Sequence, residues 1–177
     1  MAHWSMAELD DAFRTYWRVG AVGEDWNAWC DLFTDDALYI EHMYGNMRGR
    51  ENIRKWIVPV MAKYLEIYTG YEWHTVDEER GRVILYVQNR RDHPSGTGTC
   101  DFPGVTILDY AGNGRWSQEE DYYSISGRDR AMKEYQAGLT VNPGHPQQGT
   151  RRHWGNGPAW TKGNESYATR PAPGVRG

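Results

Sequence analysis

Apolar residues in the first 64 positions recur at helical spacing and predict three helices. The first stripe follows a Ser5–Glu8 capping box, and the helix should end by residues 20–23, which hold two glycines. Its members are Leu9, Ala12, Phe13, Tyr16 and Trp17. A second helix is expected from about residue 25 to residue 33. A third stripe begins after Arg50, and because Pro59 lies within it, we expect a kink or a later start.

Between the second and third helices, branched and aromatic residues predict a strand. This strand should cover residues 37–42, and a turn should follow over residues 43–49, which hold two glycines and an asparagine. Beyond residue 70 the period is two, which predicts hairpins of 71–78 with 82–90 and of 99–110 with 115–125, and then a short helix over 126–137. Helices followed by a strand meander predict an α+β domain in which helices cover one sheet face.

Length and composition limit the class of protein further. A chain of 177 residues can bury a core of its own, and its two cysteines, Cys30 and Cys100, show no metal-ligand spacing. Residues 1–11 contain acidic positions where a signal peptide needs basic and apolar ones, and the longest apolar run is too short to cross a membrane. We therefore expect a soluble, cytoplasmic protein without membrane partners.

Charge divides the chain into two parts. The formal net charge of −4 argues against a general affinity for nucleic acid, although residues 138–177 carry five basic side chains and one acidic side chain. This segment is rich in proline and glycine and holds a single leucine, so it cannot build a core. We expect a domain over residues 1–137 and a basic tail over 138–177. The tail's aromatic residues, Trp154, Trp160 and Tyr167, suit an arm packed on its own domain or on a partner, and a flexible tail is an equal alternative.

The order of elements around residues 26–64 resembles a known superfamily. A helix, the sequence DLFTDDA, a strand, the sequence GNMRGRENIRKW and a further helix are similar to the SnoaL-like branch of the nuclear transport factor 2 superfamily. The resemblance covers roughly residues 6–137. It implies a cone in which N-terminal helices pack in the concave face of a curved, mostly antiparallel sheet. It also implies a pocket for a small hydrophobic molecule and a homodimer formed through the outer sheet face.

The ketosteroid isomerases of this superfamily imply positions for catalytic groups. Their proton-shuttling base falls on His42, if this strand holds one extra residue, and their oxyanion-binding tyrosine falls on Tyr16. Their second oxyanion donor, an aspartic acid, is replaced by Thr106. Because a threonine hydroxyl is a weaker donor than a protonated acid, the isomerase reaction itself is not expected. His74 matches a histidine that many members, including scytalone dehydratase, carry on the corresponding strand.

Alternation along the last strand adds further candidates. Glu119, Asp121 and Tyr123 should face inward while the residues between them face outward. Asp121 beside His42 or His74 could fix the imidazole tautomer and raise its basicity, an arrangement similar to that of the polyketide cyclases. We expect the catalytic group to comprise His42, His74, Asp121 and Tyr16. The residues expected to bind substrate are Thr106, Glu119, Tyr123, Trp56 and Trp29.

These residues support two functional hypotheses. The first is a cofactor-free enzyme that dehydrates, isomerises, cyclises or hydrates a small, apolar, oxygenated molecule. The second is a non-catalytic ligand-binding or dimerising module on the same fold, in which the histidines are ordinary core or rim residues. No phosphate loop, HExxH or Gly-x-Ser-x-Gly motif occurs, and we expect neither a metal nor a cofactor.

Overall fold

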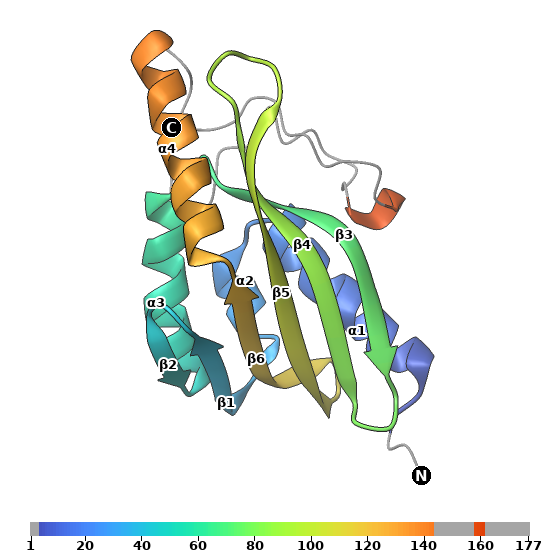
Figure 1. The fold of residues 1–177 in the computed structure, drawn as a ribbon. Helices are drawn as coiled ribbons and strands as arrows, with labels where there is room; N and C mark the ends of the chain where they lie inside the picture. The colour runs from blue at the N-terminus through green and yellow to red at the C-terminus, as the bar shows by residue number, and fades with distance from the viewer. Residues whose placement is uncertain (1–3, 144–157, 162–177) are drawn as a thin grey trace.

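The computed structural model describes residues 4–143 and 158–161, and these build one curved, unclosed sheet of six strands (Figure 1). The strand order is β2-β1-β6-β5-β4-β3. The strands are β1 (Phe33–Glu41), β2 (Gly45–Arg48), β3 (Tyr68–Asp77), β4 (Arg82–Asp92), β5 (Thr99–Gly112) and β6 (Arg115–Tyr123). Neighbouring strands are antiparallel except for β1 and β6, which are parallel. The expected mostly antiparallel sheet is confirmed.

Helices cover the concave face of this sheet. The helical elements are α1 (Met6–Trp17), η1 (Arg18–Val22), α2 (Trp26–Cys30), α3 (Arg50–Lys63), α4 (Ile125–Val141) and η2 (Ala159–Thr161). In Figure 1, α1 and α2 lie behind the strands, α3 lies beside β1 and β2 at one end of the sheet, and α4 continues from the end of β6. The α+β cone expected from the resemblance is therefore confirmed. None of the helices in the described ranges has the length and apolar character needed to cross a bilayer.

Helix α1 forms as its sequence pattern predicts. Ser5 caps it by accepting a hydrogen bond from the Glu8 backbone N–H at 3.2 Å. Its buried residues are Leu9, Ala12, Phe13, Tyr16 and Trp17, the five of the predicted stripe. Burial of each large member contributes about 1.5–3 kcal/mol. This stripe brings Tyr16 to the inner face of the sheet.

Three elements differ from the prediction, and tertiary pairing explains two of them. Helix α2 ends at Cys30 because Phe33 pairs with Trp116 at the start of β1. The predicted turn over 43–49 contains strand β2, which pairs with β1. Helix α4 continues to Val141, beyond the predicted end, because Ala131 and Tyr135 pack with Cys100 and Phe102 in a second apolar cluster. Helix α3 begins at Arg50 with Pro59 inside it, so a later start is excluded.

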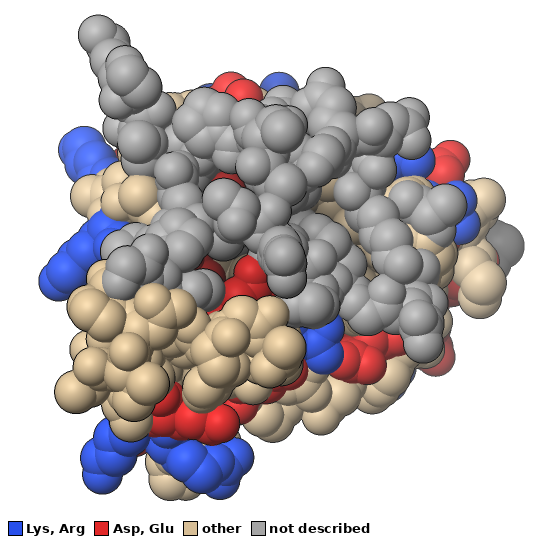
Figure 2. Space-filling view, turned by 90° about the horizontal axis from the view of Figure 1, so that it is seen from above, with Lys and Arg blue, Asp and Glu red and all other residues tan. Residues whose placement is uncertain are grey.

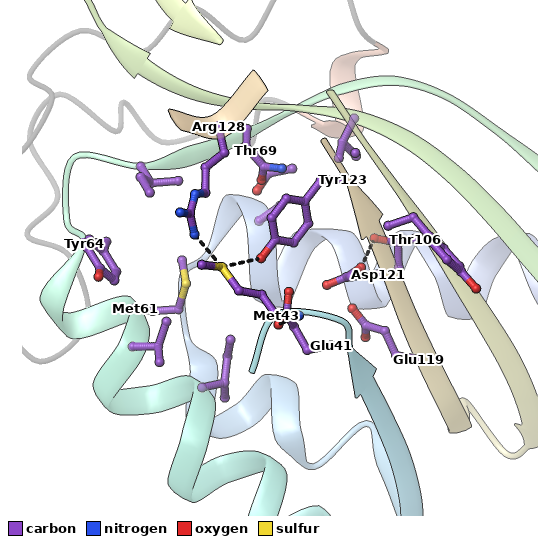
Figure 3. Close-up of a pocket in the computed structure, with 18 of the residues that line it drawn as sticks. Glu41, Met43, Met61, Tyr64, Thr69, Thr106, Glu119, Asp121, Tyr123 and Arg128 are labelled. Atoms are coloured by element: carbon purple, nitrogen blue, oxygen red, sulfur yellow. Dashed lines mark hydrogen bonds between the residues drawn. The ribbon is translucent and has the colours of Figure 1, made fainter. Parts of the chain in front are cut away.

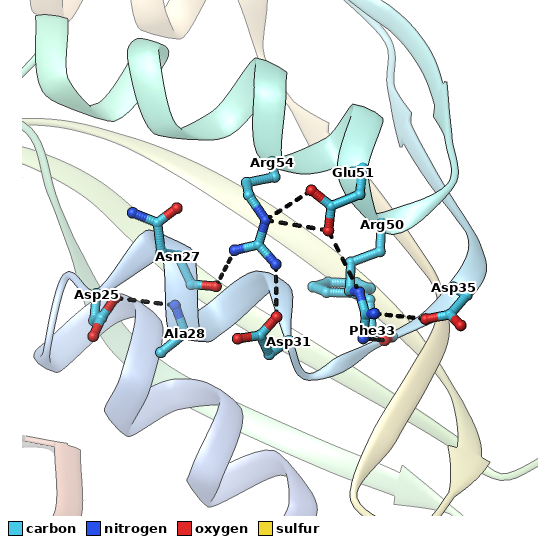
Figure 4. A network of polar contacts seen from close by, with 9 residues as sticks. All are labelled: Asp25, Asn27, Ala28, Asp31, Phe33, Asp35, Arg50, Glu51 and Arg54. Atoms are coloured by element: carbon cyan, nitrogen blue, oxygen red, sulfur yellow. Dashed lines mark hydrogen bonds and ion pairs between the residues drawn. The ribbon is translucent and has the colours of Figure 1, made fainter.

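Two arginines of α3 connect it to α2 and β1 (Figure 4). Arg54 forms an ion pair with Asp31 at 2.6 Å and donates to the Asn27 carbonyl oxygen of α2. Arg50 forms an ion pair with Asp35 at the start of β1 at 2.7 Å. Both arginine side chains are partly shielded from water while Asp31 and Asp35 are largely exposed, so each pair adds modestly to the contacts between the three elements.

One part of the C-terminal segment packs on the domain. Trp160 of η2 contacts Phe13 and Tyr71, with ring centroids 5.9 and 5.2 Å away, and Thr161 is buried. The Arg14 guanidinium lies 5.5 Å from the centre of the Trp160 ring. Residues 158–161 therefore fit the arm alternative. Trp154 and Tyr167 lie outside the described residues.

Candidate active site

A pocket of about 500 Å³ lies between the concave sheet face and the helices. Its apolar wall includes Trp17, Trp26, Trp29, Tyr39, Trp56, Ile57, Val60, Met61, Leu85 and Val87. Polar groups gather at one side, where Glu41, Thr106, Glu119 and Asp121 extend from three strands (Figure 3). An apolar cavity with a small cluster of polar groups is the usual form of a small-molecule site.

Glu119 is one of two carboxyl groups that β6 directs into the pocket. Its side chain is 2% exposed, and Oε1 accepts a hydrogen bond from the Tyr16 hydroxyl at 2.7 Å. Oε2 is buried and has no hydrogen-bond partner among the described residues. Burial, and then the negative charge of Asp121, raise the pKa of Glu119 well above its ordinary value. Glu119 therefore favours the protonated, neutral form.

Asp121 is the second of these carboxyl groups and is better supported by donors. Thr106 Oγ1 donates to Oδ1 at 2.5 Å, and the Tyr39 hydroxyl donates to Oδ2. Burial raises the pKa of Asp121, and the two hydroxyl donors act in the opposite direction by stabilising its carboxylate. Asp121 therefore ionises more readily than Glu119. One pocket thus holds a carboxyl group suited to donating a proton and another suited to accepting one.

The phenols beside these carboxyl groups remain donors. Burial, followed by the nearby carboxylates, raises the pKa of Tyr16 and of Tyr39 well above its ordinary value. Both hydroxyls therefore keep their protons at neutral pH. Tyr16 is held by its ring contact with Trp29, at a centroid distance of 5.4 Å. Gly20 permits this arrangement, because a Cβ at that position would lie 2.5 Å from Trp29 Cδ1.

Glu41 is a third pocket carboxylate, and it is not among the candidates expected from the sequence. It is 3% exposed, and its Oε2 accepts backbone hydrogen bonds from Met43 at 2.8 Å and Tyr44 at 2.5 Å. The resemblance to isomerases placed the base on His42 by assuming an extra residue in this strand. From Leu38 to Glu41, β1 pairs with β6 without interruption, so the inward position falls on Glu41. A one-residue change of register exchanges the two sheet faces.

His42 consequently lies on the outer face, and its expected place in the pocket is corrected. Its side chain is 50% exposed, its Nε2 lies 2.9 Å from Glu120 Oε1, and its ring packs 4.5 Å from that of Tyr122. Glu120 belongs to the outward set of β6, and Tyr122 is 47% exposed although it also borders the pocket. The alternation of strand residues therefore separates His42 from Asp121.

His74 is also outside the pocket. Its Nε2 lies 2.9 Å from Asp10 Oδ1 and its Nδ1 lies 2.8 Å from the Tyr71 hydroxyl. The imidazole packs on Phe13 at a centroid distance of 4.3 Å, between α1 and β3. The expected partnership of His74 with Asp121 is corrected, because the side chain meets a carboxylate of α1 instead.

The other candidates line the pocket. They are Tyr16, Trp29, Trp56, Thr106, Glu119, Asp121 and Tyr123. Tyr123 donates to Met43 Sδ at 3.5 Å, and burial together with Glu41 raises the pKa of its phenol. Arg128 of α4 also donates to Met43 Sδ, so α4 and the β1–β2 connection meet at the pocket beside Tyr123 (Figure 3). Viewed from above, Asp and Glu side chains are visible both near the middle of the molecule and along its edges, while most visible Lys and Arg lie near the edges (Figure 2).

The ketosteroid isomerase-like class of folds has a curved sheet that wraps around helices and encloses a pocket, and this protein has that architecture. The model of the SnoaL-like domain matches residues 11–119, and the chain belongs to the SnoaL-like family. A comparison with curated proteins gives no match.

Solved structures show the same fold in proteins of several activities. An LEH-like epoxide hydrolase of M. tuberculosis is similar with a TM-score of 0.60 and 14% identity, over 76% of this chain and 96% of that chain. A steroid delta-isomerase of Pseudomonas aeruginosa is similar with a TM-score of 0.54 and 16% identity, over 78% and 96%. A ketosteroid isomerase-like protein of Catenulispora acidiphila in complex with trimethylamine has a TM-score of 0.52 and 21% identity, over 83% and 100%.

Proposed function

We propose that this protein is a cofactor-free acid/base enzyme that acts on a small, apolar molecule bearing an oxygen function. Glu119 is the general acid and Asp121 is the general base, with Tyr16 and Tyr39 as the hydroxyl donors that position them. The observation that carries the proposal is the placement of these two unequal carboxyl groups at one side of an apolar pocket of about 500 Å³.

The proposed chemistry moves one proton at each carboxyl group. Glu119 donates its proton to an oxygen of the substrate, and Asp121 accepts a proton from a carbon or from an attacking water. Hydration of an epoxide, for example, forms one C–O bond to water and breaks one C–O bond of the ring, whose oxygen takes the proton of Glu119. Return of a proton from Asp121 to Glu119 restores the starting state. The same pair serves an isomerisation: Asp121 takes a proton from one carbon while Glu119 protonates the carbonyl oxygen. The enol then returns its O–H proton to Glu119 as Asp121 delivers the proton to another carbon.

The family and its structural neighbours support this reaction class. The chain belongs to the SnoaL-like family, and similar folds include an epoxide hydrolase and a steroid isomerase. The proposal assigns the proton transfers to carboxyl groups, because His42 and His74 both lie outside the pocket. A cytoplasmic location and a homodimer remain predictions from the sequence and from the family resemblance.

Turnover of a panel of small epoxides, enones and hydroxy ketones tests the proposal. With a substrate found in this panel, Glu119→Gln and Asp121→Asn should each lower kcat by about 10²–10⁴-fold, since each removes one proton transfer. Glu120→Gln is the matched control, because Glu120 lies between them on the same strand, bonds to the half-exposed His42 and does not line the pocket. Full turnover in either pocket variant, or equal loss in the control, would refute the assignment.

A second candidate is a module that binds a small organic amine without turnover. Trp56 packs between Tyr39 and Tyr44, at centroid distances of 4.9 and 6.1 Å, and Glu41 also lines this pocket. Aromatic faces beside a carboxylate suit an amine cation, and one structural neighbour is a complex with trimethylamine. Calorimetry with trimethylamine discriminates the two functions. An amine-binding module must bind trimethylamine, and Trp56→Ala must weaken that binding. The acid/base enzyme does not require trimethylamine to bind.

A further inference from the structure

Three potential metal ligands meet outside the pocket, at the end of the sheet where α4 packs. They are His93 in the loop after β4, Cys100 near the start of β5 and Glu134 of α4. One ligand atom from each lies within 4.8 Å of the other two. From this juxtaposition we propose a binding site for a divalent transition metal ion, of which Zn²⁺ fits best. The sequence did not reveal it, because the three residues are far apart and form no spacing motif.

Close packing holds the two sides of this site together. Pro94, next to His93, lies against α4 at Gly138, where a Cβ would be 2.8 Å from the proline ring. The Asn142 side-chain amide donates to the Pro94 carbonyl oxygen at 2.7 Å. The loop that carries His93 is therefore already fixed to the helix that carries Glu134, and the site needs no large rearrangement to form.

The imidazole of His93 is also oriented. Its Nδ1 lies 2.8 Å from Ser95 Oγ and accepts a hydrogen bond from the Ser95 backbone N–H at 3.1 Å. A metal-binding histidine usually bonds its second ring nitrogen to a neighbouring polar group, which fixes the ring plane. Ser95 therefore fixes the ring plane, and binding of an ion through Nε2 requires that Nδ1 carry the ring proton and donate it to Ser95 Oγ in place of accepting from the Ser95 backbone N–H.

The donor set selects the kind of ion. A thiolate, an imidazole and a carboxylate together favour a borderline ion such as Zn²⁺ over Ca²⁺ or Mg²⁺, which prefer oxygen ligands. Zinc-to-ligand distances of about 2.0–2.3 Å place tetrahedral ligands roughly 3.3–3.8 Å apart. The three atoms must therefore approach slightly, and Glu134 can do this because it is exposed. Cys100 is fully buried and provides the fixed side of the site.

Such a site would join α4 to the β4–β5 end of the sheet. None of the three residues lines the pocket among the described residues, so the ion is not placed to take part in the proposed chemistry. The same helix carries Arg128, Asp129 and Met132, which do line the pocket. A bound ion would therefore fix the position of one pocket wall, independently of whether the protein is an enzyme.

Titration of the full chain with Co²⁺ tests the proposal, because thiolate ligation gives a charge-transfer absorption band. Cys30 and Cys100 are the two cysteines of the chain, and both are buried, so they form a matched pair. We expect the band in the wild type and in Cys30→Ser, and its loss in Cys100→Ser. Absence of the band from the wild type, or its persistence in Cys100→Ser, would overturn the site.

Loss of the band through misfolding of Cys100→Ser must be distinguished from loss of a ligand. Glu134→Gln provides the second variant, because Glu134 is exposed and its replacement leaves the core intact. Its affinity for Zn²⁺, measured by competition with a chromophoric chelator, should fall at least about tenfold. His42→Gln is the control for adventitious binding to an exposed histidine and should leave the affinity unchanged. Equal affinities in Glu134→Gln and the wild type would contradict the proposal.

Discussion

The carboxyl group of Glu119 lies where water cannot stabilise its charge. Tyr16 satisfies one of its oxygens and the described residues leave the other without a partner. An unpartnered buried oxygen is costly when it carries charge, and protonation removes that cost. The same feature that suits Glu119 to donate a proton should therefore make it a liability for stability at high pH.

The pH dependence of stability follows from the raised pKa of Glu119. Above the ordinary value of 4.5, the unfolded chain releases this proton while the folded protein keeps it, so stability falls as pH rises toward the folded-state pKa. Glu119→Gln lacks this titration and keeps an acceptor for Tyr16. We expect the variant to become progressively more stable relative to the wild type between pH 5 and pH 8, as measured by urea unfolding.

Glu120→Gln provides the contrast in the same measurement. Its hydrogen bond from Tyr122 lowers the pKa of Glu120, so its stabilising contribution is present above the ordinary value and is lost as pH falls. This variant should therefore lose stability relative to the wild type as pH rises from 3 to 6. If the stabilities of the two glutamine variants, relative to the wild type, changed with pH in the same direction, the opposite pKa shifts assigned to Glu119 and Glu120 would be contradicted.

The pH dependence of turnover is a second prediction at this scale. Deprotonation of the acid limits the rate at high pH and protonation of the base limits it at low pH, which gives a bell-shaped profile of kcat/KM. The two limbs belong to the Glu119 and Asp121 pair, because the charge of Asp121 raises the pKa of Glu119. Residual turnover of Asp121→Asn should lack the acidic limb, and retention of that limb would assign it to another group.

Single residues were predictable from sequence where alternation alone decides their orientation. Glu119, Asp121 and Tyr123 lie on the inner face of β6, as period two requires. The position of His42 was wrong because it depended on a register, and one residue moved the inward position to Glu41. Isolated strand positions contain no information that fixes such a register.

Among the elements, η2 has the clearest energetic consequence. Trp160 packs against Phe13 and Tyr71 and beneath the charge of Arg14. Trp160→Ala should lower the free energy of unfolding by about 1–3 kcal/mol, less than for a fully buried tryptophan because part of the ring is accessible. Urea unfolding of the full chain measures this change.

Trp73→Ala is the matched control for that variant. Trp73 lies on β3 and is 49% exposed, so its loss should cost less than about 1 kcal/mol. Equal destabilisation by the two substitutions would show that η2 adds no specific packing. A larger effect of Trp160→Ala would support the view that the C-terminal segment is an arm on its own domain.

Long amphipathic elements were predictable, and short ones were not. The five-residue stripe of α1 and the two hairpins follow from periodicity and turn residues. Strand β2 was missed because its glycine and asparagine resemble a turn, and only pairing with β1 makes it a strand. Helix α2 was predicted too long because Phe33 fits both a helical stripe and the sheet position that it occupies opposite Trp116.

At the scale of the whole molecule, the sequence supports the α+β class, and the resemblance supplied the cone. The curvature of the sheet and the parallel pairing of β1 with β6 are long-range features that no local pattern contains. The metal site is hidden for the same reason, since three distant segments form it.

The homodimer is a prediction at this scale. Trp73 and Tyr122 leave large aromatic surfaces exposed on β3 and β6, which a second copy could cover. Light scattering at micromolar concentration should give the mass of two chains. The mass of one chain would refute the dimer and leave the pocket unaffected.

The proposed function depends on how the two carboxyl groups of β6 divide the roles of acid and base. Titration of the side-chain carboxyl carbons by NMR, with signals assigned by Glu119→Gln and Asp121→Asn, tests it directly. Glu119 should keep its proton well above pH 4.5, and Asp121 should ionise before it. Titration of Glu119 near pH 4.5, or its ionisation before Asp121, would contradict this division of roles.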